Sequence, residues 1–270
     1  MVLPSGATAQ RPVTPVNGMI RYNSENGRFE GYQAGAWQDI LTGSALAAAP
    51  DRGIQFNSGG NFAADSNFVY TSQGTLIISG VNTGIAQTPA TMTGSHMFFD
   101  PSSGALRAGS VYGGEWDNAN IGNNSVAMGM SSLASGQGSV SIGFSTQASN
   151  MNAVSIGNGS VASGDTSVAL GEATASGDRA FAVQGGAAAG NYAIAMGYSV
   201  VAGGDYSMGL GLGVPTSGPQ TVSGTNSFGI FMGDQSSRTL SASNTMGLFG
   251  GQMVRWFCPP VPPLSARLRL

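Results

Sequence analysis

The chain has 270 residues, of which 43 are glycine and only 9% are charged, whereas about one quarter of a typical globular protein is charged. All ten basic residues are arginine and the formal net charge is −3, so the chain has neither a basic patch for nucleic acid nor a polybasic segment for an anionic membrane. One cysteine and one histidine exclude a disulfide framework and a Cys/His zinc site within one chain, and no run of about 18 apolar residues predicts a transmembrane helix. This composition favours an elongated string of small β modules.

The first 41 residues predict a small β module. A strand at residues 18–23 is followed by the turn pair Asn26-Gly27, a returning strand at residues 28–32 and an aromatic-containing run at residues 36–40. Asn-Gly is the strongest short-range signal for a hairpin, because both residues tolerate positive φ. The spacing resembles the small module at the base of phage and prophage tail-fibre proteins, which implies that residues 1–41 attach the chain to a particle.

The first six residues contain neither a basic segment nor an apolar segment of the kind found in secretory signals. We therefore expect that the chain does not use a standard secretory route.

Residues 42–118 predict a β-rich shaft or shoulder. An alanine-rich linker at residues 42–50 precedes short apolar runs separated by Gly, Ser and Asn turns. A hairpin is predicted around residues 101–104. The segment from Phe99 to Gly122, with Trp116 near its end, is similar to the lead-in of fibre proteins that carry adhesin-type repeats.

A short phrase recurs through residues 119–213 with a period of 14 residues and two steps of 13. Its first copy is Ser125-Val126-Ala127-Met128-Gly129, and a second phrase of the type Leu133-Ala134-Ser135-Gly136 lies between the copies. A fixed period with two strand-like phrases per unit predicts a solenoid.

Alternation along each strand gives the phrase one large apolar face and one small face. We expect the large face, Val126 and Met128 in the first copy, to fill a narrow core. The small face, Ser125, Ala127 and Gly129, would let a neighbouring backbone approach closely. Each coil holds too few large apolar side chains to offset the ordering of its backbone, so stacking and association with other chains must supply the remaining stability.

The repeats resemble the head repeats of trimeric autotransporter adhesins, because Asn124-Ser125-Val126-Ala127-Met128-Gly129 matches their Asn-Ser-Val-Ala-Ile-Gly phrase nearly residue for residue. The resemblance implies an all-β fold, a left-handed parallel β-roll solenoid, in which three identical chains pack as a homotrimer.

Two segments follow the repeats. Residues 214–251 echo the phrase at longer spacing and predict a β connector that closes the roll. Residues 252–270 are rich in Pro and Arg, contain Cys258 and no acidic residue, and do not continue the pattern. We interpret this tail as atypical and disordered or out of frame, since nothing in it resembles the C-terminal chaperone of related fibres.

No catalytic, cofactor-binding or metal-binding set emerges. Asp165, Asp178 and Asp205 recur at one repeat position, where a carboxylate column could bind calcium. The favoured interpretation is structural, because Asp and Asn side chains at turns satisfy local backbone donors. We therefore expect no enzyme activity.

Candidate receptor contacts come from positions whose residue type varies. The residue after the repeat glycine changes freely and includes Phe144 and Tyr198, while Tyr192 and Tyr206 occupy another turn. These four aromatic side chains are the candidate surface contacts with a glycan or protein receptor.

The sequence thus predicts a structural fibre protein that presents a rigid trimeric β-roll for attachment to a host or surface receptor. Its expected partners are two further copies of itself, a particle baseplate or another fibre protein through residues 1–41, and a host surface glycan or protein. No nucleic acid, membrane insertion or cofactor is expected, and the location would be a virion tail fibre or the cell surface. A bacterial trimeric surface adhesin is the alternative, and a fibre-borne polysaccharide depolymerase is the third.

Overall fold

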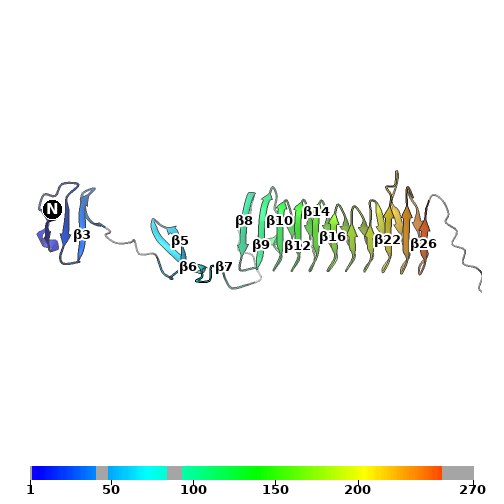
Figure 1. The fold of residues 1–270 in the computed structure, drawn as a ribbon, viewed down its shortest axis with the longest axis horizontal. Helices are drawn as coiled ribbons and strands as arrows, with labels where there is room; N and C mark the ends of the chain where they lie inside the picture. Colours follow the sequence, from blue (N-terminus) through cyan, green and yellow to red (C-terminus); the bar gives the residue numbers. More distant parts are fainter. Residues whose placement is uncertain (1, 41–47, 84–92, 251–270) are drawn as a thin grey trace, which may run out of the picture. The chain divides into compact units, whose positions relative to one another are not determined.

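The computed structural model describes residues 2–40, 48–83 and 93–250, and the chain divides into two units, Met1–Ser79 and Gly80–Leu270 (Figure 1). Across the described ranges the only helical turns are η1 (Thr8–Gln10) and η2 (Asn118–Asn120), and no helix there is long and apolar enough to span a membrane. Most of the predicted linker and the whole of the atypical tail, with Cys258, lie outside the described residues.

The first unit begins with a four-stranded sheet in the order β1-β2-β3-β4. Its strands are β1 (Ser5–Gly6), β2 (Ile20–Asn23), β3 (Arg28–Gln33) and β4 (Ala36–Ile40). The predicted hairpin is confirmed: β2 and β3 are antiparallel, and Gly27 adopts a φ of 72° in the turn between them. The third predicted run pairs with β3 as β4, and β1 adds in parallel to β2.

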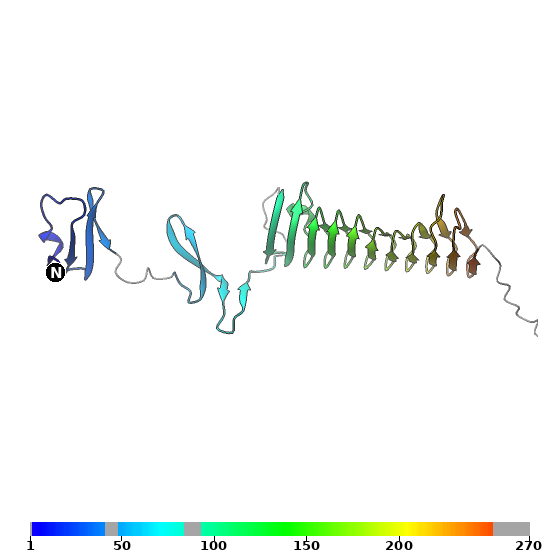
Figure 2. The same cartoon turned by 45° about the horizontal axis from the view of Figure 1, so that its top comes forward.

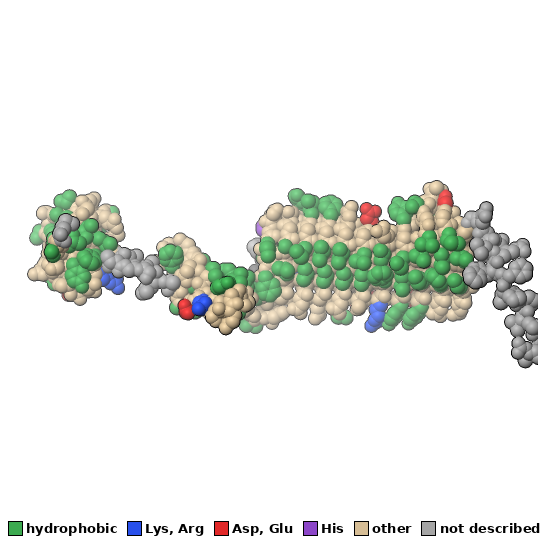
Figure 3. All heavy atoms as spheres, in the orientation of Figure 1, with side chains coloured by type: hydrophobic (Ala, Val, Ile, Leu, Met, Phe, Trp, Pro, Cys, Tyr) green, Lys and Arg blue, Asp and Glu red, His purple; other side chains and the backbone are tan. Residues whose placement is uncertain are grey.

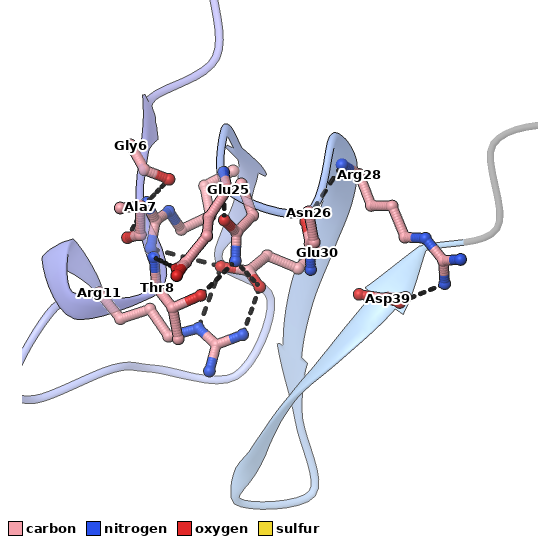
Figure 4. A network of polar contacts seen from close by, with 11 residues as sticks. Gly6, Ala7, Thr8, Arg11, Glu25, Asn26, Arg28, Glu30 and Asp39 are labelled. Carbon is pink, nitrogen blue, oxygen red and sulfur yellow. Dashed lines mark hydrogen bonds and ion pairs between the residues drawn. The ribbon is translucent and has the colours of Figure 1, made fainter.

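A buried carboxylate holds the N-terminal segment onto this sheet. The side chain of Glu30 is fully buried and accepts hydrogen bonds from Arg11 Nε at 3.1 Å, Arg11 Nη2 at 2.5 Å and Asn23 Nδ2 at 3.2 Å (Figure 4). Arg21 lies 3.3 Å from the same carboxylate and donates to the carbonyls of Gly6 and Ala7. The hydrogen bonds from Arg11 lower the pKa of Glu30, because they favour its charged form.

We expect Glu30→Gln to destabilise this module by about 2 kcal/mol, because two buried or half-buried guanidinium groups lose their counter-charge. Hydrogen–deuterium exchange of the β2–β4 amides in the full chain would measure the loss. Asp39→Asn is the matched control: it removes only the exposed ion pair with Arg28 and should change exchange little. Since the pKa of Glu30 is lowered in the folded state, its stabilisation is complete above the ordinary Glu value of 4.5 and is lost as the pH falls from there through the lowered pKa. An unchanged exchange rate in Glu30→Gln would show that Glu30 does not hold the N-terminal segment onto the sheet.

The same unit contains a three-stranded antiparallel sheet of β5 (Gly53–Ser58), β6 (Asn61–Tyr70) and β7 (Leu76–Ile78). Several of its large apolar side chains, among them Phe62 and Leu76, are exposed. The sheet therefore lacks a core of its own in a single chain.

The second unit is a parallel β-roll, so the predicted all-β solenoid is confirmed (Figures 1 and 2). Each coil contributes one strand to an 11-stranded sheet and one to an 8-stranded sheet, and the sequence period sets the register: Val126 pairs with Val140, and Val140 with Val154. The larger sheet contains β8 (Gly94–Asp100), β9 (Ala105–Val111), β10 (Val126–Met130), β12 (Val140–Phe144), β14 (Val154–Asn158), β16 (Val168–Gly171), β18 (Phe181–Val183), β20 (Ile194–Met196), β22 (Met208–Leu212), β24 (Phe228–Met232) and β26 (Met246–Phe249). The smaller sheet contains β11 (Leu133–Ala134), β13 (Gln147–Ala148), β15 (Val161–Ala162), β17 (Thr174–Ala175), β19 (Ala187–Ala188), β21 (Val200–Ala202), β23 (Gln220–Val222) and β25 (Thr239–Leu240).

The roll extends beyond the repeats at both ends. On the N-terminal side the hairpin of β8 and β9 joins the larger sheet, because β9 pairs in parallel with β10. On the C-terminal side β22 pairs with β24 and β24 with β26, so the segment predicted as a connector forms further coils. The extra residues at 213–219 and 233–238 leave the coil as loops, and the register of the strands continues past them.

The interior of the roll corrects the expected orientation of the repeat. The small residues are inside: Ala127, Ala169, Ala182 and Ala195 are fully buried at equivalent positions. On β12 and β14 the same column contains Ser141 and Ser155. Their hydroxyls are also buried and hydrogen bond across the coil to the hydroxyls of Thr146 and Ser160. From β10 to β20 these small side chains occupy the inward positions of the larger sheet, so the large apolar face points outward and does not fill the core.

Larger side chains close the two ends of the interior. At the N-terminal end Arg107 is fully buried and donates to the carbonyls of Leu106, Ser125 and Ala134, while burial lowers its pKa to about 10. Trp116 is buried beside it and donates to the carbonyl of Ser132 at 2.9 Å. At the C-terminal end the rings of Phe231 and Phe249 stack at 5.0 Å.

The repeat glycines permit close packing of coils. Gly129, Gly143 and Gly157 have φ values of 112°, 133° and 130°. A Cβ at Gly143 would lie 1.9 Å from the carbonyl oxygen of Gly157 in the next coil. Glycine recurs here because any side chain would both strain the backbone and overlap the neighbouring coil.

Candidate functional site

The outward face of the larger sheet carries a continuous band of apolar side chains, visible along the roll in Figure 3. We call this band the apolar stripe. It consists of two columns, one residue of each column per strand: Val126, Val140, Val154, Val168, Phe181, Ile194, Met208, Phe228 and Met246; and Met128, Ile142, Ile156, Leu170, Val183, Met196, Leu210, Ile230 and Leu248.

The apolar stripe is incompletely covered in a single chain. Its members are half-buried or exposed, with Ile156 at 38% and Met246 at 65% exposure, and neither column contains a charged or polar residue. Soluble monomers rarely expose contiguous apolar patches larger than a few hundred Å². The stripe is therefore a surface suited to contact with another apolar surface.

The structure separates the four candidate receptor contacts into two pairs. Phe144 is the last residue of β12 and Tyr198 lies just after β20, whereas Tyr192 and Tyr206 lie at the corners that precede strands of the larger sheet. Tyr192 comes before β20 and Tyr198 after it, so the pairs occupy opposite ends of the strands. All four side chains are exposed, by 42 to 58%. They do not form one site.

Tyr192 and Tyr206 form a ladder with Arg179 from the preceding coil. The two tyrosine rings stack with centroids 4.8 Å apart, and the guanidinium of Arg179 lies 5.2 Å from the Tyr192 ring and donates to its hydroxyl at 2.8 Å. All three residues have positive φ, as do Asn152 and Asn226 at equivalent corners. Asn adopts this conformation readily and Tyr does not, so the tyrosines are poor choices for the turn and are candidates for a functional role.

Asp and Asn side chains link neighbouring coils at the position directly before each residue of the tyrosine ladder. Asp178 Oδ1 accepts a hydrogen bond from the backbone N–H of Asp165 at 3.0 Å. Asn191 and Asp205 accept from Asp178 and Asn191 in the same way, at 3.0 and 2.8 Å. The oxygens thus bond to the backbone of the preceding coil and not to their own turn, and within the described ranges no three His, Cys, Asp or Glu residues group to hold a metal.

These coils are also recognisable by comparison with known proteins. Residues 121–183 match the YadA head domain repeat. The family is described as "YadA head domain repeat (2 copies)", and its model matches the overlapping segments 121–146, 134–160, 148–172 and 162–183. The matched YadA-head repeats run from just before β10 to the end of β18, so they are adhesin-type coils of the β-roll. No curated protein matches the chain.

Two features of the roll, the outward position of the apolar stripe and the burial of Arg107, were not predicted from the sequence. The sequence predicts the apolar stripe to fill the core, although its positions vary among Val, Ile, Leu, Met and Phe, while the inward column of the larger sheet from β10 to β20 contains only Ala and Ser. Arg107 was not identified as buried. Its register partner Ala127 is the signal that places it inside, once β9 is known to pair in parallel with β10.

Proposed function

We propose that the chain is a structural fibre protein whose β-roll forms a homotrimer and attaches to a receptor on a host surface, in the manner of a tail fibre. The observation that carries the proposal is the apolar stripe, an uncharged face that runs along the whole roll. The adhesin-type repeats support it, because the heads of trimeric autotransporter adhesins, which they resemble, are assemblies of three identical chains.

The energetics favour association. Covering a half-exposed large apolar side chain contributes about 1 kcal/mol, and every larger-sheet strand from β10 to β26 supplies two such side chains. The sum over the stripe exceeds the cost of association, which is roughly 4–15 kcal/mol. Three chains are the number that the adhesin heads suggest.

In this proposal the exposed aromatic corners contact the receptor, a surface glycan or protein. Each trimer presents three copies of every corner, so weak individual contacts gain avidity through a high effective concentration. Residues 1–41 would attach the fibre to a baseplate or another fibre protein. The proposal includes no cofactor, nucleic acid, membrane insertion or catalysis.

The tyrosine ladder can be tested without disturbing the turn. We expect the double variant Tyr192→Asn/Tyr206→Asn to keep the fold, because Asn occupies equivalent corners, and to bind host cells roughly tenfold or more weakly, as expected when interface aromatics are lost. Tyr70→Ala, which changes a tyrosine 49% exposed in β6 of the first unit and so outside the roll, is the control. Flow cytometry with labelled full-length protein would measure binding. Equal binding by the wild type, the double variant and the control would show that the tyrosine ladder does not contact the receptor.

A bacterial surface adhesin is the second candidate, favoured by the match to YadA-head repeats. Antibodies against the roll distinguish the two: a tail fibre would be detected on purified particles, and an adhesin on the producing cell. A depolymerase would release new reducing ends from surface polysaccharide during the binding assay, and we expect none.

A further inference from the structure

Two consecutive corners of the roll are shorter than their neighbours. Residues 158–160 connect Gly157 to Val161, but only residues 172–173 connect the equivalent Gly171 to Thr174, which pairs with Val161. The next corner, residues 185–186, is equally short. The two 13-residue steps of the sequence period thus remove one residue each from the same corner.

The corners then lengthen again. Residues 198–200 restore the ordinary length, and the loop at residues 212–219 projects beyond it. Thr216 in this loop donates to the carboxylate of Asp234 in the next loop, from its backbone N–H at 3.3 Å and its hydroxyl at 2.7 Å, which braces the two loops together. Figures 1 and 2 show the edge of the roll dipping after β16 and rising again at β22.

The dip contains a hollow of about 410 Å³ lined by Asn158, Gly171, Glu172, Gln184 and Tyr198. We call it the Tyr198 notch. The Tyr198 ring rests against Gly185 of the shortened corner, where a Cβ would lie 3.3 Å from the ring. A side chain at residue 185 would therefore displace the ring.

A second hollow, of about 370 Å³, adjoins the notch and shares Gln184 and Tyr198 with it. Its lining includes Val183, Met196 and Leu210, which belong to the apolar stripe. The proposed association of chains would cover the stripe residues of this second hollow, whereas the lining of the Tyr198 notch includes no residue of the stripe.

The lining combines three chemistries that recognise a sugar ring. An aromatic ring offers an apolar face to the C–H groups of a pyranose. The carboxylate of Glu172 and the amides of Asn158 and Gln184 can accept from and donate to its hydroxyls. The lining contains no Arg or Lys, so the negative charge of Glu172 disfavours anionic sugars.

The tyrosine ladder offers less uncovered ring surface. The faces of Tyr192 and Tyr206 cover each other at 4.8 Å, and Arg179 lies over Tyr192. Tyr198 stacks with no other aromatic ring among the described residues.

From this geometry we propose that the Tyr198 notch binds a neutral pyranose unit of a surface polysaccharide. The inference rests on the proposed attachment function. It names the class of ligand, and the residues that bind it, for one contact between the roll and the receptor.

Saturation-transfer difference NMR on the full-length protein tests the notch, with maltotriose, chitotriose and lactose as neutral probes and sialyllactose as the anionic probe. We expect saturation of the C–H protons of at least one neutral probe and at least fivefold less for sialyllactose. Tyr198→Ala should reduce the signal at least fivefold and Glu172→Gln by a smaller factor. Tyr70→Ala, which changes a tyrosine 49% exposed in β6 of the first unit, is the control and should leave the signal unchanged. Circular dichroism verifies that each variant retains its β structure.

The proposal is overturned if no neutral probe receives saturation, if Tyr198→Ala retains the wild-type signal, or if sialyllactose is preferred. Cell binding and the mass of the assembly are measured on the same samples. If the wild-type protein binds cells and assembles as proposed but gives no sugar signal, only the assignment of the notch fails. If the wild-type protein neither binds cells nor assembles, the proposed attachment function fails.

Discussion

Replacing Ile156 by glutamate is expected to convert the assembled protein into single chains. Ile156 lies in the middle of the apolar stripe, in register between Ile142 and Leu170. In one chain the new carboxylate would be solvated, because the side chain points out of the roll and is 38% exposed. In the assembly it would be buried without a partner in an uncharged face, at a cost of about 3–5 kcal/mol for each chain.

Sedimentation velocity of the variant and the wild type measures this change. Thr174→Glu is the matched control, since it introduces the same charge at an exposed position of the smaller sheet and should leave the assembly intact. Far-UV circular dichroism must remain that of a β protein in both variants. Assembly of Ile156→Glu to the wild-type size would show that the apolar stripe is not the contact between chains.

Gly143→Ala is expected to destabilise the roll by more than about 4 kcal/mol, in the range of the most damaging single substitutions. Its φ of 133° lies where residues with a Cβ are strained. The new Cβ would also lie 1.9 Å from the carbonyl oxygen and 2.9 Å from the carbonyl carbon of Gly157. Both atoms belong to the backbone of the next coil, so relief requires separation of the coils and loss of hydrogen bonds between β12 and β14.

Gly159→Ala is the control for the backbone effect alone. Gly159 also has positive φ, 64°, but no atom lies within 4 Å of the position that its Cβ would take, so a cost of about 1–2 kcal/mol is expected. Thermal unfolding followed by circular dichroism compares the two variants. Equal losses of stability would mean that coil-to-coil contact at the glycine ladder does not limit the stability of the roll.

The sequence period was sufficient to predict the coils and their register. The 14-residue spacing places Val126, Val140 and Val154 in one column, and the structure pairs them. The period could not decide which face is inside, because alternation shows only that Val126 and Ala127 point in opposite directions. The repeat phrase contains that information only indirectly, in the uniformly small residues of the column that is buried from β10 to β20.

The corners were predictable as surface positions but not as sites. Free variation of residue type placed Phe144 and Tyr198 outside the roll, where they are exposed. The separation of Tyr198 from Tyr192 depends on which corner of the coil each occupies, which follows from the strand boundaries. The Tyr198 notch depends on where the 13-residue steps lose a residue, and that position becomes visible only when both sheets are aligned.

The mass of the full-length wild-type protein under native conditions tests the central claim most directly. Assembly of three chains through the apolar stripe predicts a single species of three times 27.1 kDa at micromolar concentration in native mass spectrometry. A stable species of 27.1 kDa with a complete β signal would contradict it, because the exposed stripe would then be compatible with a soluble single chain.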